Sequence, residues 1–435
     1  MGKQIESQTR IEKILAYFTH KIIAKYKPVV IGITGSVGKT STRHAIAAAL
    51  SSKYQLREPE KNYNNTIGIP LTVIGAKGID ESTTWFASQL GWLRIIAKAL
   101  VVWLLPQTYP KLLVLEYGID HPGDMDELLN LVQPNIAVLT SIGISHLENY
   151  ESQEQLANEK GKIASRLKPN GLLVFNGDDF LVTEQASKVN AHKISYGKTN
   201  DVEIILENIS ETLSLNAQTN LEIKTPTRKL AISIPAIGES HVSAVLCAVA
   251  LCESLEVETD LIVKGLTHYR PMPGRLNILA GIKRTILIDD TYNSAPASTK
   301  KALSLLEQFP NQTKVAVLGD MLELGNDSQN AHEEIGKICA DMFSRGRLSE
   351  LVTIGNHAKD IANSAIQNGM PQEKVTSFEN SDLAKNSVLA RLQNESVVLV
   401  KGSQGARTEK VVKELLAEPM SATHMLVRQY GKWVN

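Results

Sequence analysis

One short segment of the sequence combines the residue types that bind a triphosphate. Residues 34–41 read Thr-Gly-Ser-Val-Gly-Lys-Thr-Ser, between a β-branched run at 29–34 and a helical pattern at 40–50. Glycines let backbone N–H groups curl around phosphate oxygens, and the following helix directs its positive end at the anion. We therefore expect ATP here, with Lys39 at the β- and γ-phosphates and Thr40 on a magnesium ion. The other loop residues expected to bind ATP are Gly35, Ser36, Val37, Gly38 and Ser41.

Two further charged residues stand where predicted strands end. Glu116 closes the apolar run 112–116, and Lys401 follows the run 397–400. The carboxyl ends of parallel strands meet at one edge of a sheet, which is where such sheets bind ligands. A charge at a strand end is also often only solvated. The pattern alone therefore leaves both interpretations open.

The elements that must position these residues alternate as in a parallel α/β sheet. Residues 6–26 form an amphipathic helical pattern that Pro28 ends. After the loop, strands are predicted at 112–116, 136–141 and 172–176, and helices at 124–131 and 154–167. Short alternating runs at 202–206 and 230–234 predict a small antiparallel insert, followed by a helix at 242–255.

A break with two prolines and a glycine lies at 269–274, and a second α/β series follows it. The predicted strands of this series are 285–288, 314–318, 351–354 and 397–400. We therefore predict an α/β fold in three parts. These are an N-terminal amphipathic helix (1–28), a central P-loop ATPase domain with a parallel sheet (29–268) and a Rossmann-like C-terminal domain (269–435).

Composition narrows the class of protein. The 435 residues are too many for one core, and 46 basic against 46 acidic residues give no bulk attraction to nucleic acid. The three cysteines form neither a disulfide framework nor a zinc site, and no signal-peptide pattern opens the chain. We expect a cytoplasmic monomer without a nucleic-acid partner.

Residues 85–105 are apolar over most of their length, but Arg94 and Lys98 interrupt them on one helical face. Two cations in mid-span argue against a transmembrane helix. The segment fits a helix packed on its own sheet. It also fits an interfacial helix in peripheral contact with a membrane, anchored by Trp85, Trp92 and Trp103.

The phosphate loop has Ile33 where a strict Walker pattern has glycine, and this short form resembles the loop of the Mur ligases. Further segments similar to that family follow in order over nearly all of the remaining chain. They are NNTIGIP (64–70), LEYG with HPGD (115–118, 121–124), TSIGISHLE (140–148), DDTYNSAP (289–296), LGDMLELG (318–325) and VKGS (400–403). The last three are similar to the D-alanyl-D-alanine-adding type in particular.

The resemblance implies an ATP-dependent ligase that joins D-alanyl-D-alanine to a UDP-N-acetylmuramoyl tripeptide in peptidoglycan precursor synthesis. A substrate carboxylate would attack the γ-phosphate of ATP to give an acyl phosphate, and the incoming amine would then displace phosphate. Two anions meet in the first step, so cations must neutralise them.

The resemblance also implies two magnesium ions. Thr40 and Glu116 would bind one, and His146 would bind the second together with Lys160. Lys160 would act as a carbamate, formed with carbon dioxide, which requires a lowered pKa. Lys162 is close enough to be confused with it, but the Lys-x-x-Ile spacing favours Lys160. Lys39, His146 and Lys160 are thus expected to be catalytic.

In the C-terminal part the resemblance implies that Arg275 contacts phosphate and Asp290 the ribose of ATP. Tyr292 and Asn293 would lie near the nucleotide or the interdomain cleft, and Lys401 would stabilise the acyl phosphate catalytically.

Asn64 and Asn65 would position the substrate, and His332 either caps an element or faces the cleft. Two departures from the family stand out. Only about 28 residues precede the ATP-binding strand, where the family has a uridine-binding domain, and no asparagine follows His241 to contact adenine. A ligase for another acid and amine (a folate, another peptide or a polymer) and a silent ATP-binding scaffold remain alternatives.

Overall fold

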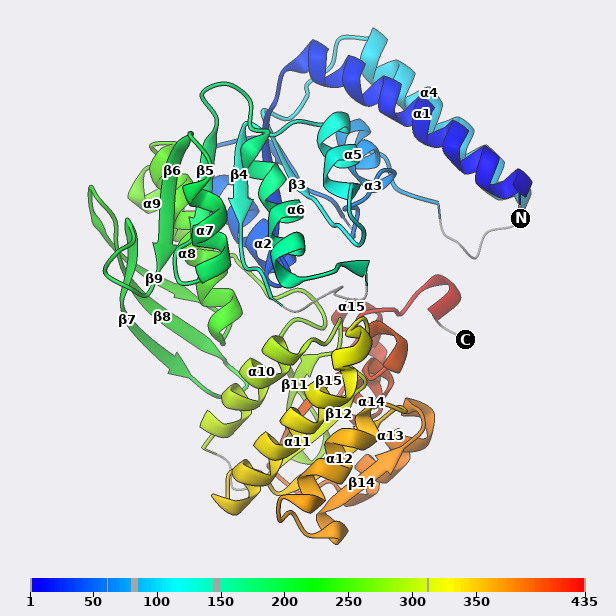
Figure 1. Cartoon of the computed structure of the whole chain (residues 1–435), viewed down its shortest axis with the longest axis vertical. Coiled ribbons are helices and arrows are strands. Elements are labelled where there is room, and N and C mark those ends of the chain that lie inside the picture. The colour runs from blue at the N-terminus through cyan, green and yellow to red at the C-terminus, as the bar shows by residue number, and fades with distance from the viewer. Residues whose placement is uncertain (1, 61, 80–84, 144–148, 311–312, 434–435) are drawn as a thin grey trace.

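The computed structural model describes residues 2–60, 62–79, 85–143, 149–310 and 313–433, which are arranged around two sheets (Figure 1). In the described part of the chain the first sheet has nine strands, in the order β2-β3-β1-β4-β5-β6-β7-β8-β9. Pairing is parallel from β2 to β7 and antiparallel from β7 to β9. These strands are β1 (Val29–Thr34), β2 (Leu56–Arg57), β3 (Leu112–Glu116), β4 (Ile136–Leu139), β5 (Leu172–Asn176), β6 (His192–Gly197), β7 (Ile204–Thr212), β8 (Gln218–Lys224) and β9 (Lys229–Ile234).

Helices cover both faces of this sheet, which is why its central strands are apolar on both sides. In β1, Ile31 and Ile33 face one helical layer and Val30 faces the other. The first layer consists of α2 (Lys39–Leu50), α8 (Glu239–Ser254) and α9 (Thr259–Thr267). The second consists of α1 (Gly2–Tyr26), α3 (Gly68–Ile74), α4 (Trp85–Leu104), α5 (Asp124–Leu131), α6 (Gln153–Ser165) and α7 (Phe180–Ser187).

The second sheet has six strands among the described residues, in the order β10-β11-β15-β12-β13-β14, and only β10 runs antiparallel to its neighbour. They are β10 (Asn277–Ala280), β11 (Ile286–Asp290), β12 (Lys314–Gly319), β13 (Glu350–Ile354), β14 (Val375–Phe378) and β15 (Val397–Lys401). One face is covered by α10 (Pro296–Gln308), α11 (Ser328–Ser344) and α12 (Ala358–Gln367). The other is covered by α13 (Ser381–Arg391), α14 (Glu409–Leu415) and α15 (Ala422–Met425).

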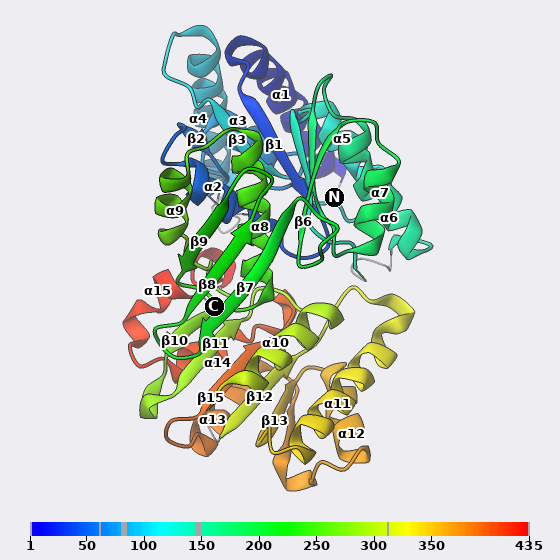
Figure 2. The ribbon, with the colours of Figure 1, turned by 90° about the vertical axis from the view of Figure 1, so that its left-hand side faces the viewer.

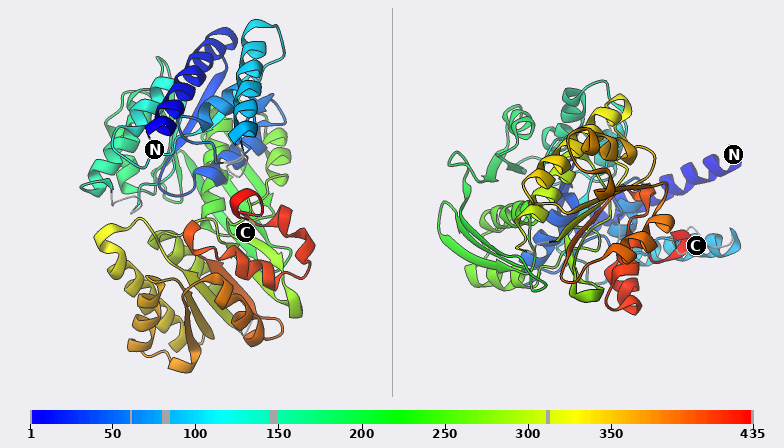
Figure 3. Two further views of the ribbon diagram at one scale, coloured as in Figure 1. Left: turned by 90° about the vertical axis from the view of Figure 1, so that its right-hand side faces the viewer. Right: turned by 90° about the horizontal axis from the view of Figure 1, so that it is seen from below.

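Short 3₁₀ turns complete this half: η2 (Ile282–Arg284), η3 (Gly325–Asp327), η4 (Gln372–Lys374), η5 (Gln404–Ala406), η6 (Pro419–Ser421) and η7 (Gly431–Trp433). Figure 2 shows the two sheets one above the other, with α10 at the junction between them. The helices α1 and α4 lie side by side at the end of the molecule away from the second sheet (Figure 3).

The predicted α/β alternation is confirmed, and β1, β3 and β5 have the predicted bounds. The predicted antiparallel pairing is also confirmed, and the structure adds where this segment attaches. Tyr196 of β6 pairs with Ile204 of β7, so β7, β8 and β9 extend the main sheet. Buried and exposed residues alternate along β8, which leaves one face of this extension open to solvent.

Candidate active site

The loop after β1 turns sharply and rests against the end of β4. Gly35 (φ 150°) and Gly38 (φ 90°) adopt backbone conformations that favour glycine, and a Cβ on Gly35 would collide with Oγ1 of Thr140. The Ser36 N–H donates to the carbonyl oxygen of Ser141 (2.7 Å). These contacts hold the loop against the segment that follows β4. The first N–H groups of α2 have no carbonyl acceptor within their own helix.

Lys39 begins α2 and folds over this loop. Its Nζ donates to the carbonyl oxygen of Gly35 (2.5 Å). Burial lowers the pKa of Lys39 below its ordinary value, and the charge of Arg275 acts in the same direction while Glu116 opposes it. The ammonium group therefore lies beside the glycines that would hold the phosphates.

The Thr40 hydroxyl and the Glu116 carboxylate meet where α2 and β3 approach each other. Oγ1 of Thr40 lies 3.4 Å from Oε2 of Glu116. Among the described residues no group of three or more His, Cys, Asp or Glu side chains gathers as a metal site. Magnesium commonly takes one or two protein oxygens and completes its shell with phosphate and water. The Thr40–Glu116 pair fits such an ion only beside a bound triphosphate.

Arg43 is a site residue that the sequence analysis missed. Its side chain is 1 % exposed, its Nε lies 3.0 Å from Oε1 of Glu116, and its Nη1 donates to the carbonyl oxygen of Pro59 (2.5 Å). The signal was present, because Arg43 follows Thr40 by three residues and so shares its face of α2. The arginine fixes one oxygen of Glu116 and leaves the other facing Thr40.

Lys160 and Lys162 lie on α6 in opposite surroundings. Lys160 is 1 % exposed, and burial, with a smaller contribution from Lys39, lowers its pKa well below the ordinary value. Lys162 forms ion pairs with Asp126 (2.7 Å) and Glu159 (2.7 Å). A lysine must be neutral to react with carbon dioxide, so these surroundings favour Lys160 over Lys162.

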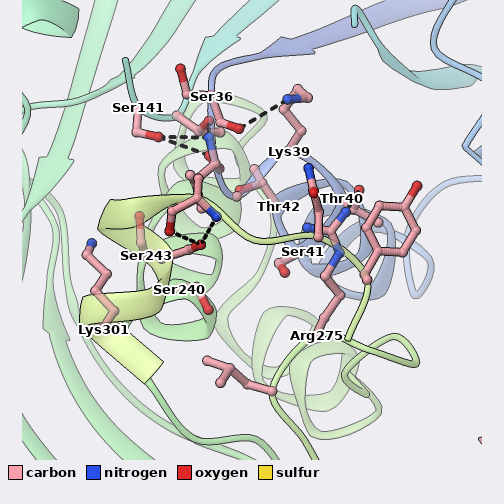
Figure 4. A pocket seen from close by; sticks show the side chains of 18 of the residues that line it. Ser36, Lys39, Thr40, Ser41, Thr42, Ser141, Ser240, Ser243, Arg275 and Lys301 are labelled. Carbon is pink, nitrogen blue, oxygen red and sulfur yellow. Dashed lines mark hydrogen bonds between the residues drawn. The ribbon is translucent and has the colours of Figure 1, made fainter. Parts of the chain in front are cut away.

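Arg275 reaches the phosphate loop from the C-terminal half. Its Nη2 lies 3.4 Å from Oγ1 of Thr40, and its guanidinium group stacks 4.0 Å from the centroid of the Tyr292 ring. Figure 4 shows Arg275 and Thr40 pointing toward one another, with Lys301 of α10 elsewhere on the cavity wall. The two halves of the chain thus contribute adjacent groups to one site.

Asp290 and Lys401 end the neighbouring strands β11 and β15, and the structure pairs them. Nζ of Lys401 lies 2.6 Å from Oδ2 of Asp290 and donates to the carbonyl oxygen of Asn293 (2.9 Å). The sequence analysis expected these two residues to act separately, one on the ribose and one on the acyl phosphate. Their separation of 111 residues left no local sign of the ion pair.

Asn64 and Asn65, which the sequence analysis assigned to the substrate, also make hydrogen bonds within the fold. Oδ1 of Asn65 accepts a hydrogen bond from the Gly68 N–H (2.8 Å), where α3 begins. The Asn64 carbonyl accepts from the Gly118 N–H (2.9 Å) behind Glu116. Both residues line the cavity described below.

His241 and His332 are buried and hold backbone in place. Nδ1 of His241 lies 2.6 Å from the Tyr269 hydroxyl and Nε2 lies 2.9 Å from the Arg275 carbonyl oxygen, while burial lowers the pKa of His241 to about 4. The neutral ring therefore supports the turn that carries Arg275. Nε2 of His332 accepts from the Met321 N–H (3.0 Å), so this residue caps a loop and does not face the cleft.

A cavity of about 580 Å³ lies between the two sheets. This volume is in the range of small-molecule sites. Its wall includes the phosphate loop, and it carries Glu116, Arg275, Asp290 and Lys401 together with the polar residues Ser240 and Ser243 of α8. The glycine cradle, the cations and the Thr40–Glu116 oxygens fit a triphosphate with a divalent ion. His146 lies outside the described residues.

Two family models match the chain. The Mur ligase middle domain matches residues 33–252, and the Mur ligase glutamate ligase domain matches residues 274–404. The UDP-N-acetylmuramoyl-tripeptide–D-alanyl-D-alanine ligase of Bacillus subtilis (strain 168) is 30 % identical over 394 residues, which are 90 % of this chain and 77 % of that enzyme.

Solved structures give the same answer for the fold. A crystal structure of MurF from Acinetobacter baumannii superposes with a TM-score of 0.75 at 25 % identity, over 94 % of this chain and 80 % of that one. MurF from Thermotoga maritima in complex with ADP has a TM-score of 0.75 at 22 % identity, over 93 % and 83 % of the two chains. At 22 % identity, the similarity to the Thermotoga maritima structure is one of fold.

Proposed function

The chain belongs to the Mur ligase family, and on that premise we propose that it joins D-alanyl-D-alanine to a UDP-N-acetylmuramoyl tripeptide at the expense of ATP. The observation that carries the proposal is the meeting of Thr40, Glu116 and Arg275 beside the phosphate loop, with 3.4 Å between neighbouring groups. A carboxylate can attack a triphosphate only where cations and a divalent ion neutralise both anions.

ATP supplies an activated phosphoryl group: a carboxylate oxygen bonds to the γ-phosphorus as ADP leaves, and the amine then displaces inorganic phosphate and loses a proton. Lys39 and Arg275 neutralise the phosphate oxygens from two sides. Thr40 and Glu116 would hold one magnesium ion, and Arg43, 3.0 Å from Oε1 of Glu116, would keep the other carboxylate oxygen toward it. Arg43 is in this account a positioning residue.

The second magnesium ion is assigned to His146 and Lys160, the latter as a carbamate. Burial of Lys160 supports this part of the proposal, because it favours the neutral amine that reacts with carbon dioxide. Asp290, which pairs with Lys401, would contact the ribose of ATP, and Tyr292 and Asn293 line the same cavity. Lys401 would stabilise the acyl phosphate, and Asn64 and Asn65 would guide the peptide substrate.

We infer in addition that the enzyme acts as a monomer in the cytoplasm. The three cysteines support a reducing compartment, since Cys247, Cys252 and Cys339 are all free and buried.

Release of ADP tests the function. We expect it to require both the UDP-muramoyl tripeptide and D-alanyl-D-alanine, and to disappear in Lys39→Met, while Lys264→Met on the outer helix α9 keeps full activity. A panel of other acids and amines, including a folate with glutamate, is assayed in parallel. ADP release with another pair only would replace the substrate assignment, and no ADP release with any pair would support a silent scaffold.

The carbamate has its own test. Lys160→Ala should lose ligation and regain part of it when a short-chain carboxylate is added, because the added anion replaces the carbamate oxygens. Lys162→Ala is the matched control and should need no rescue. A Lys160→Ala enzyme that stays fully active, or one that no carboxylate restores, would contradict the carbamate.

A further inference from the structure

The helices α1 and α4 form a pair at the end of the molecule away from the second sheet (Figures 1 and 3). Nζ of Lys25 donates to the carbonyl oxygens of Trp103 (2.8 Å) and Leu105 (2.7 Å), and the Tyr26 hydroxyl donates to that of Val102 (2.9 Å). These bonds occupy carbonyls at the C-terminal end of α4 that its own helix leaves free. The pair is therefore a fixed part of the fold.

The outer face of α4 is a row of exposed apolar side chains. Leu93 and Leu104 are each 62 % exposed. The other exposed members of the row are Leu90, Leu100, Val101 and Leu105. The positions 90, 93, 100, 101 and 104 fall on one side of the helix at 3.6 residues per turn, and Leu105 directly follows the end of α4. A single exposed leucine needs no explanation, whereas a continuous row marks a surface that meets an apolar partner.

Two of the three tryptophans expected to anchor this helix at a membrane, Trp92 and Trp103, do not form the exposed face. Trp92 and Trp103 are partly buried against the core, and the Trp103 ring packs edge-on against Tyr17 at 5.9 Å between centroids. The side chain of Trp85 lies outside the described residues. The leucines opposite Ile95 and Ala99, which face inward, carry the apolar surface.

Charge identifies the partner. The exposed residues of the α1–α4 pair include Arg94 and Lys98 on α4 and Lys13 and Lys21 on α1, while the sequence of α4 contains no acid. Nζ of Lys21 lies 5.8 Å from the centroid of the Trp103 ring, and Nζ of Lys98 also donates to the carbonyl oxygen of Gly75. Glu12 of α1 accepts a hydrogen bond from Thr66 (3.0 Å). The chain as a whole is neutral, with 46 basic and 46 acidic residues, so this excess of cations is local.

We propose that the outer face of α4 docks on the surface of an anionic lipid bilayer, with the leucines in the headgroup region and the flanking cations on acidic headgroups. A second copy of the chain fits this face less well, because a symmetric contact would bring the same cations together. No helix in the described chain combines the length and the apolar character needed to cross a bilayer. The contact is therefore peripheral.

This inference does not depend on the proposed function, because the row lies outside the cavity wall. The full-length chain is floated with vesicles of phosphatidylglycerol and phosphatidylcholine, or of phosphatidylcholine alone, at low and at high salt. We expect binding to the anionic vesicles at low salt, little binding to neutral ones, and a loss of binding as salt rises.

Matched variants test the apolar and the electrostatic components of vesicle binding. Leu93→Ser combined with Leu104→Ser should weaken vesicle binding by about tenfold or more, and Arg94→Glu combined with Lys98→Glu should do the same at low salt. Leu383→Ser, at a leucine that is 56 % exposed on α13, should bind as the parent chain does. Circular dichroism and Tm establish that each variant is folded, and ADP release without vesicles should be unchanged.

Three results would overturn the docking proposal. The first is no binding to anionic vesicles at low salt, and the second is equal binding of the parent and leucine variants. The third is a dimer in solution that the leucine variants dissociate, because that result would assign the row to a second copy of the chain.

Discussion

At the scale of single residues, Arg43 shows how the site is held together. Its Nε lies 3.0 Å from Glu116 and 3.5 Å from Glu58, and it is almost fully buried. Burying these charges carries a desolvation penalty that their mutual attraction offsets, so removal of one partner leaves the others uncompensated. A magnesium ion beside Glu116 would then compensate part of that loss.

We predict that Arg43→Met lowers the free energy of unfolding by about 3–5 kcal/mol. Added Mg²⁺ should raise the Tm of this variant more than that of the parent chain, because the ion neutralises Glu116. Thermal scans with and without Mg²⁺ measure both effects. An unchanged Tm would show that the carboxylate does not depend on Arg43.

Lys160 makes stability depend on pH. Its folded-state pKa lies well below the ordinary lysine value of 10.5 because of burial. Between these two values the unfolded chain binds more protons than the folded one, so the contribution of Lys160 to stability decreases as the pH falls from 10.5.

Replacement of Lys160 by Met should therefore raise the Tm relative to the parent, by an increment that grows from pH 10.5 toward neutrality. Scans in metal-free buffer without carbon dioxide isolate this effect. Lys162→Met loses two ion pairs and should show no such gain. A constant difference between Lys160→Met and the parent across this range would refute the assignment.

At the scale of elements, short polar contacts set where helices begin and how they join the site. The Asn65 side chain accepts from the N–H groups of Ile67 (3.2 Å) and Gly68 (2.8 Å) at the start of α3. His241 of α8 supports the segment that carries Arg275. Both contacts act on backbone, so they shape the site without touching a ligand.

Asn65→Ala should cost about 1 kcal/mol of stability, the usual effect of losing a side-chain acceptor at a helix start. Denaturant titration measures this cost. Asn65→Asp keeps the acceptor and should stay close to the parent. A loss of ligase activity much larger than the loss of stability would instead indicate that Asn65 also contacts the substrate.

The buried His241 should make α8 sensitive to acid. Its pKa is about 4 in the folded chain, against 6.5 as the ordinary value, so protons bind the unfolded state preferentially between these values. The free energy of unfolding of the parent chain should thus decrease by on the order of 3 kcal/mol as the pH falls through this window. The free energy of unfolding of His241→Gln should decrease less, because glutamine stays neutral. Burial raises the pKa of Asp289 to about 6, so this residue adds stability as the pH falls, and it does so equally in both proteins.

At the scale of the whole molecule, the site exists because the strand ends of two sheets face one cavity. Figure 2 shows how these halves meet. Glu239 of the first half pairs with Lys198 (2.8 Å) and with Lys301 of the second half (3.0 Å). Arg275 and Thr40 make another polar contact across the junction, as do His241 and the Arg275 carbonyl oxygen. Such polar contacts suit a junction that closes on a ligand and excludes water.

Arg275→Ala should weaken binding of a non-hydrolysable ATP analogue about tenfold or more, because a charge-assisted contact to phosphate is lost. Calorimetric titration measures the Kd. Arg270→Ala is the matched control, since Arg270 lies five residues earlier and donates to carbonyls of its own turn. Equal affinity of the two variants would remove Arg275 from the nucleotide site.

The sequence by itself determined the local features of this protein. Apolar β-branched runs between glycines and polar residues predict β1, β3 and β5 to the residue, and the glycine–lysine loop after β1 predicts its phosphate site. Such features depend on propensities and spacings within a few residues. The resemblance to the Mur ligases likewise favoured Lys160 over Lys162, and Lys160 is the buried one of the two.

Only the tertiary structure decided which distant side chains meet. The Asp290–Lys401 ion pair, the Arg43–Glu116 contact and the continuation of β6 into β7 join residues or elements whose partners no local pattern names. The same holds for α4, where Trp92 and Trp103 turn inward while Leu93, Leu104 and the other exposed leucines face outward. Which face of a helix is buried depends on what packs against it, and that is a property of the assembled chain.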